Sequence, residues 1–149
     1  MRLAAYQPDI PQNLGALMRL SVCFDMPLDV IEPCGFPFST RAVRKAAMDY
    51  GTQADLRAHD SWEAFQQNRG SGRLILLTTK GATPHWECAF RPDDTLLLGR
   101  ESAGVPASVH QVADARVLIP MPGGGRSLNI AMAAGIVAAE AIRQLTCVT

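Results

Sequence analysis

A chain of 149 residues has the length of one domain, and 48% hydrophobic with 19% charged residues is the balance of a folded globular protein. The formal net charge of zero excludes binding to nucleic acid through overall charge. No apolar run reaches the roughly 18 residues of a membrane span, and the first residues lack a signal-peptide core. We therefore predict a cytoplasmic protein that does not associate with membranes. We expect a single domain over residues 1–149.

The first half of the chain is predicted to alternate between strands and helices. Leu14, Leu17 and Met18 recur at helical spacing after Pro11, which indicates a helix. Asp60 and Glu63 resemble a capping box that starts another helix. The predicted strands are residues 3–6, 28–31 and 54–58; the predicted helices are residues 12–24, a short segment capped by Ser39 or Thr40, and residues 60–67.

The second half continues the alternation. Residues 73–79 and 95–98 are continuous apolar runs, which is typical of central strands buried on both faces. A helix from Pro106 to about Val112, a strand over residues 116–119 and a last helix over residues 127–145 follow. Strands that alternate with helices imply an α/β fold with a parallel sheet and helices on both faces.

The cysteines and histidines do not form a metal-binding pattern. None has the short paired spacing of a zinc or redox motif, so we predict reduced thiols and no metal site. These residues are Cys23, Cys34, Cys88 and Cys147, with His59, His85 and His110.

The last predicted helix is apolar almost all the way round between residues 128 and 139. A helix without a polar face is buried on every side, and one small sheet cannot cover all of it. We therefore predict a homodimer packed on this helix, with burial entirely within one chain as the alternative.

Three loops follow buried strands and combine glycine with polar residues: residues 78–84, 99–106 and 120–127. Ligands of parallel α/β sheets bind beyond the carboxyl ends of the strands, so these loops are the candidate site. The run from Gly123 to Ser127 matches no nucleotide-binding fingerprint. It could bind a ligand or be a flexible turn with Ser127 as an N-cap.

The arginines admit two interpretations. Arg19 lies one and a half turns after Asn13 in the first helix, and it is either functional or simply solvated. Arg41, Arg44 and Lys45 form a basic helix that either contacts phosphate groups or faces solvent.

Together these segments resemble the SPOUT superfamily of trefoil-knotted RNA methyltransferases. The sequences PQNLGALMR, LLLGRESAGVP and IPMPGGGRSLNIA correspond in order to its three motifs. The segments IEPCGFPFS, VRKAAMDYG and LLTTKGATP resemble the subfamily that 2′-O-methylates the wobble nucleotide of leucine tRNAs. The resemblance covers essentially the whole chain and implies a C-terminal trefoil knot.

The resemblance also implies a ligand and a set of site residues. The three loops become a pocket for S-adenosylmethionine, with S-adenosylhomocysteine as product and no metal. The implied cofactor-binding residues are Leu77, Gly99, Ile119, Ser127 and Leu128. The implied partner is tRNA, through its anticodon stem-loop. The candidate substrate-binding residues are Asn13, Arg41, Arg44, Lys45, Glu101, Arg126 and Asn129.

The catalytic residue implied by the resemblance is Arg19. A guanidinium is effectively always protonated, so we expect Arg19 to stabilise the developing alkoxide as a cation rather than to act as a base. Two alternatives remain open at this stage: the same chemistry on another tRNA or rRNA nucleotide, and a nucleotide-sensing α/β module without catalysis.

The sequence departs from the superfamily pattern at three places. Gly123, Gly124 and Gly125 replace a Pro-Asp-Ser-like stretch, Ala131 and Met132 replace the Ser-Asn of the usual Asn-x-Ser-Asn, and Ala47 replaces a glycine. The lost hydroxyl and amide groups put fine cofactor contacts in question, but not the pocket as a whole.

Overall fold

The computed structural model describes residues 1–47, 50, 53–81 and 83–147. Within them, seven strands form one parallel sheet in the order β3-β2-β1-β6-β4-β7-β5. The strands are β1 (Arg2–Tyr6), β2 (Leu28–Ile31), β3 (Leu56–His59), β4 (Leu74–Leu77), β5 (Thr83–Pro84), β6 (Thr95–Leu98) and β7 (Ala115–Leu118). The helices are α1 (Pro11–Cys23), α2 (Thr40–Ala46), α3 (Trp62–Asn68), α4 (Ala107–Val112) and α5 (Ile130–Thr146), with a 3₁₀ turn, η2 (His85–Glu87).

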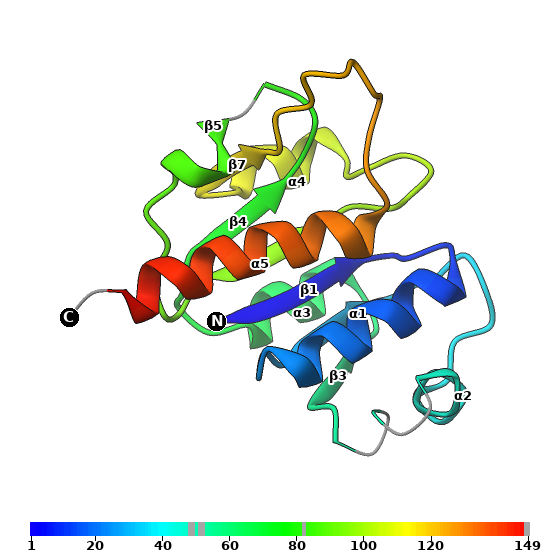
Figure 1. The fold of residues 1–149 in the computed structure, drawn as a ribbon. Coiled ribbons are helices and arrows are strands. Elements are labelled where there is room, and N and C mark those ends of the chain that lie inside the picture. The colour runs from blue at the N-terminus through cyan, green and yellow to red at the C-terminus, as the bar shows by residue number, and fades with distance from the viewer. Residues whose placement is uncertain (48–49, 51–52, 82, 148–149) are drawn as a thin grey trace.

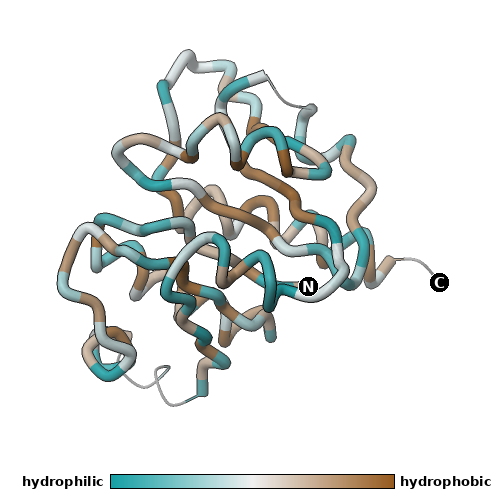
Figure 2. The backbone as a smooth tube through the Cα atoms, turned by 180° about the vertical axis from the view of Figure 1, so that it is seen from behind, coloured by the Kyte–Doolittle hydropathy of each residue, from teal (hydrophilic) through white to brown (hydrophobic). Residues whose placement is uncertain are grey.

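Helices cover both faces of the sheet, as predicted (Figure 1). Successive strand residues point to opposite faces, and β4 shows the division. Ile75 packs in the cluster that contains α1 and α5, whereas Leu74 and Leu76 pack with α3 and α4 on the other face. Hydrophobic residues accordingly concentrate along the central strands and hydrophilic residues in the outer loops (Figure 2).

The observed ends of several elements differ from the predicted ones. The N-cap of α3 is Ser61, whose hydroxyl accepts a hydrogen bond from the Ala64 amide at 3.0 Å, so the capping box at Asp60 was wrong by one residue. Asn129 caps α5 through bonds from the Ala131 and Met132 amides, so Ser127 is not the cap. The cap of α2 is Ser39, one of the two predicted residues. The strand predicted at residues 54–58 is observed at Leu56–His59, and β5 and η2 were not predicted.

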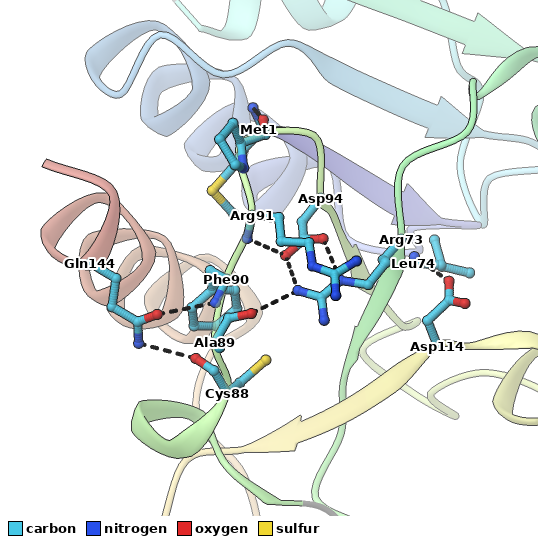
Figure 3. A network of polar contacts seen from close by, with 11 residues as sticks. Met1, Arg73, Leu74, Cys88, Ala89, Phe90, Arg91, Asp94, Asp114 and Gln144 are labelled. Carbon is cyan, nitrogen blue, oxygen red and sulfur yellow. Dashed lines mark hydrogen bonds and ion pairs between the residues drawn. The ribbon is translucent and has the colours of Figure 1, made fainter. Parts of the chain in front are cut away.

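A polar network fixes the edge of the sheet where β4 and β6 begin (Figure 3). The fully buried Asp94 carboxylate accepts hydrogen bonds from the Arg73 guanidinium at 2.9 and 2.8 Å and from the Arg91 amide at 2.8 Å. Gln144 of α5 accepts from the Phe90 amide and donates to the Cys88 carbonyl. These bonds tie α5 to the connection between η2 and β6.

α5 buries only one face within a single chain. Ala134, Val137, Ala138 and Ala141 are buried against the sheet, whereas Met132 is 59% exposed and Ile136 39% exposed. The alternative of complete burial within one chain is therefore wrong. In the part of the chain described, no helix has the length and apolar character needed to cross a membrane. The trefoil knot remains a prediction from the resemblance.

Candidate active site

A cavity of about 670 Å³ opens beyond the carboxyl ends of β4, β6 and β7. All three glycine-bearing loops predicted from the sequence contribute to its lining, together with the beginnings of α1 and α5. The parallel sheet causes this convergence, because the loops after neighbouring parallel strands leave the sheet at the same edge.

The residues expected to contact the cofactor all line this cavity. Leu77 and Ile119 contribute apolar side chains at the ends of β4 and β7, and Leu128 contributes another just before α5. Gly99 and Ser127 complete the set. Apolar surface next to accessible backbone is the kind of lining that a flat heterocycle such as adenine requires. Their contact with a cofactor remains a prediction.

Gly99 is required by the close approach of two backbone segments. A Cβ atom at this position would lie 2.8 Å from the Cα and carbonyl carbon of Gly104. Arg100 and Gly104 exchange two backbone hydrogen bonds, of 3.0 and 2.8 Å, and Gly104 has a φ of 65°. The loop is thus a closed turn whose shape depends on glycine at both ends.

A chain of hydrogen bonds joins the three motif regions at the cavity. The amide nitrogen of the Asn129 side chain donates to Asn13 Oδ1 at 2.9 Å, and Asn13 Nδ2 donates to Glu101 Oε1 at 3.2 Å. The other Glu101 oxygen accepts from the Asp9 backbone amide at 3.0 Å. Three predicted substrate-binding residues, Asn13, Glu101 and Asn129, are therefore brought together, and they bond to one another.

The side chains of Glu101 and Asp9 have pKa values that are shifted in opposite directions. Burial raises the pKa of Glu101, and the adjacent Asp9 side chain raises it further. The hydrogen bond from Glu101 lowers the pKa of Asp9, and a second bond from the Ser102 hydroxyl acts in the same direction. The two carboxyl groups are therefore electrostatically linked.

Arg19 is not among the residues that line the cavity, although the resemblance implies that it is the catalytic residue. Six residues along an α-helix turn through about 600°, which leaves Arg19 about 120° from Asn13 around the axis and about 9 Å further along it. The guanidinium carbon instead lies 4.9 Å from the centre of the Tyr50 ring. In a single chain, the proposed catalytic cation is thus outside the cavity.

The other predicted phosphate contacts separate into two groups. Arg126 lines the cavity and is exposed. On α2, Arg41 and Lys45 are four residues apart and both exposed, so they share an outward face. Arg44 is half-buried and donates to the Ala54 carbonyl at 3.2 Å, which gives it a structural role.

Several lining residues were not predicted individually. Lys80 and Arg100 add positive charge at the cavity and lie inside loops that the sequence did indicate. Ile10 and His110 also line it, and nothing in the sequence marked them, because their proximity depends on how α1 and α4 pack. No group of three His, Cys, Asp or Glu side chains suited to a metal ion is found among the described residues.

Proteins of similar sequence match this chain over nearly its full length. The chain is 53% identical over 145 residues to a tRNA (cytidine(34)-2′-O)-methyltransferase of Beijerinckia indica subsp. indica, covering 96% of this chain and 91% of that protein. It is 35% identical over 147 residues to the enzyme of the same name from Escherichia coli strain K12, covering 97% and 94%.

Solved structures show the same fold. A structure from work on the 2-OH methylation of C/U34 on tRNA matches with a TM-score of 0.89 and 43% identity, covering 97% of this chain and 95% of that one. An AdoMet-bound rRNA methyltransferase from Sinorhizobium meliloti matches with a TM-score of 0.84 and 27% identity, covering 97% and 56%.

The sheet, its helices and the cavity define a three-layer α/β protein with a cavity beyond the carboxyl ends of the central strands. The chain belongs to the SpoU rRNA Methylase family, whose model matches residues 1–139. The resemblance inferred from the three sequence motifs is thereby confirmed.

Proposed function

We propose that this protein transfers a methyl group from S-adenosylmethionine to the ribose 2′-hydroxyl of the wobble nucleotide, position 34, in leucine tRNAs in the cytoplasm. The observation that carries the proposal is the cavity into which all three motif loops converge. The relatives support the choice of substrate, since proteins named for 2′-O-methylation of cytidine 34 match nearly the full length of this chain.

The cavity suits the methyl donor in size and in lining. Its volume of about 670 Å³ lies within the roughly 300–1,000 Å³ of small-molecule sites. Leu77, Ile119 and Leu128 would enclose the adenine, and the closed turn between Gly99 and Gly104 shapes the cavity wall beside it. S-adenosylmethionine supplies a methyl group on a positively charged sulfur, and its departure needs no metal.

Arg19 is the residue that we propose stabilises the reaction. Attack of the ribose oxygen on the methyl carbon would form the O–C bond and break the C–S bond, leaving S-adenosylhomocysteine, and the hydroxyl proton would pass to solvent water. A permanently charged guanidinium beside that oxygen stabilises the developing negative charge and can hold the adjacent phosphate as well. Holding oxygen, carbon and sulfur in line supplies much of the remaining rate enhancement.

A second copy of the chain would complete the site. The exposed residues of α1 include Ala16, Arg19 and Cys23, which recur at helical spacing. Met132 and Ile136 form a parallel apolar stripe on the neighbouring α5, on the same face of the sheet (Figure 1). A homodimer packed on these two helices would cover the apolar stripe and bring Arg19 of one chain toward the cavity of the other.

The anticodon stem-loop would be held by outward-facing cations and by polar groups at the cavity. Arg41 and Lys45 are exposed on α2, and Arg126 is exposed at the cavity, so all three are available to phosphates. The hydrogen-bonded residues Asn13, Glu101 and Asn129 would then orient the loops around the target ribose rather than each contacting RNA alone.

The decisive experiment incubates the purified protein with labelled S-adenosylmethionine and a leucine tRNA, followed by nucleoside mass spectrometry. We expect one 2′-O-methyl group at position 34. The matched control is the same tRNA with a 2′-deoxynucleotide at position 34, which should accept no methyl group. Methylation of another tRNA position or of rRNA would replace the proposed substrate. Calorimetric binding of S-adenosylmethionine without any transfer would instead indicate a sensing module.

A further inference from the structure

Among the described residues, the one hydrogen-bond, ion-pair or ring contact of the Arg19 side chain is with an aromatic ring. Its guanidinium carbon lies 4.9 Å from the centre of the Tyr50 ring. In the described part of the chain, Arg19 makes no ion pair with a carboxylate and no side-chain hydrogen bond. The side chain is otherwise exposed on α1.

The backbone of Tyr50 is held in place on both sides. Its amide donates to the Ala47 carbonyl at 3.3 Å, and its carbonyl accepts from the amides of Gln53 and Ala54, each at 3.2 Å. Ala47 and Ala54 are each only 6% exposed and belong to the same core cluster as Leu17 and Met18 of α1. Tyr50 and Arg19 are thus attached to a shared core.

An aromatic partner differs chemically from a carboxylate partner. A carboxylate occupies two of the five N–H donors of a guanidinium and neutralises its charge. The face of an aromatic ring attracts the cation but leaves the in-plane N–H donors free and the charge intact. A side chain held in this way can still bind a phosphate and stabilise an alkoxide.

We infer that Tyr50 is a positioning residue for Arg19, because its ring restricts the guanidinium while leaving all of its hydrogen-bond donors available to RNA. This inference rests on the proposed function. It assigns a role in methyl transfer to a residue of the segment that follows the basic helix α2, outside the three motifs and outside the cavity lining.

The test measures kcat and KM for methyl transfer in Tyr50→Leu and Tyr50→Phe. We expect Tyr50→Leu to lower kcat by about two- to fivefold, the size that an exposed cation–π contact gives, with the KM for S-adenosylmethionine unchanged. Tyr50→Phe keeps the ring face and should behave as the wild type. Thermal unfolding of both variants checks that neither change acts through global stability.

A double-mutant cycle separates positioning from a structural role. In an Arg19→Ala background, Tyr50→Leu should have no further effect on kcat, because the group that it positions is gone. An equal loss in both backgrounds, or a Tyr50→Phe variant as impaired as Tyr50→Leu, would overturn the inference while leaving the proposed function intact. A wild-type protein that does not methylate tRNA would refute the proposed function and, with it, this inference.

Discussion

Arg19 carries the charge on which the proposed methyl transfer depends. We expect Arg19→Ala to lower methyl transfer by about a hundredfold or more, the scale of one lost electrostatic stabiliser. The affinity for S-adenosylmethionine should be unchanged, since the proposed partners of Arg19 are the ribose oxygen and phosphate of the RNA rather than the cofactor. Calorimetry and single-turnover rates measure the two quantities separately. Near-normal turnover would remove Arg19 from the mechanism.

The raised pKa of Glu101 predicts a pH dependence of activity. Protonation of this half-buried carboxyl, which occurs above the pH at which an ordinary glutamate is protonated, weakens it as an acceptor for the Asn13 side chain and the Asp9 amide. The methyl transfer rate should therefore fall as the pH is lowered through the Glu101 pKa. Rates across about pH 5 to 8 measure this effect.

The contribution of Glu101 to the free energy of unfolding changes with pH in the opposite direction to the activity, and this difference provides a control. A carboxyl whose pKa is higher in the folded than in the unfolded state favours folding most strongly at low pH, and this contribution is lost as the pH rises through the folded pKa. Loss of activity on the acid side should thus precede any unfolding seen by circular dichroism. Glu101→Gln should flatten the profile, and an unchanged profile would contradict the assignment.

Individual site residues were predictable to the extent that they follow buried strands. Gly99 comes directly after an apolar run and Ile119 after another, so their place at one edge follows from the sheet. Tyr50, Ile10 and His110 have no such signal. Their positions depend on how helices dock, and a six-residue spacing along α1 was insufficient to place Arg19.

α2 combines an anchored face with a charged face. Val43 and the C-cap residue Ala47 are buried, whereas Arg41 and Lys45 are exposed. If these two cations contact phosphates, each substitution by alanine should reduce the slope of log affinity for tRNA against log salt concentration by about 0.7 to 0.9. Filter binding across a salt series measures the slope.

Arg44 is the matched comparison on the same helix. Its bond to the Ala54 carbonyl ties α2 to the core, so Arg44→Ala should lower the stability of this region while leaving the salt slope unchanged. Equal slopes for the wild type and the Arg41→Ala and Lys45→Ala variants would exclude this helix from the RNA interface.

The ends of elements were less predictable than the elements themselves. Ser61 and Asn129 cap their helices because their side-chain oxygens reach the amides two or three residues later. Asp60 and Ser127 offer the same chemistry one or two residues earlier, so composition could not distinguish them. The two-residue β5 forms through pairing with β7, which no local pattern specifies.

For the whole molecule, the exposed apolar stripe of α5 predicts association. Ile136→Glu would place a charge at the proposed dimer interface, and burying an unpaired charge is strongly unfavourable. We expect the dimer dissociation constant to rise by at least about a hundredfold, which corresponds to roughly 2.7 kcal/mol. Sedimentation velocity at micromolar concentration measures the change, and methyl transfer should fall with the dimer population.

Val112→Glu is the control for that experiment. Val112 is 46% exposed on α4, which covers the opposite face of the sheet. The substitution adds the same charge but should leave the oligomeric state unchanged. A wild-type protein that sediments as a monomer would refute the dimer directly.

The position of β1 inside the sheet, with a neighbour on each side, has a consequence for folding during synthesis. β1 pairs with β2 on one side and β6 on the other, and β6 begins roughly ninety residues later in the chain. At ribosomal rates of about 5–20 residues per second, one edge of the first strand stays open for roughly 5–20 s. An open edge is a template for pairing with other nascent chains. Rapid overexpression should therefore cause aggregation of unfinished chains before it affects the completed protein.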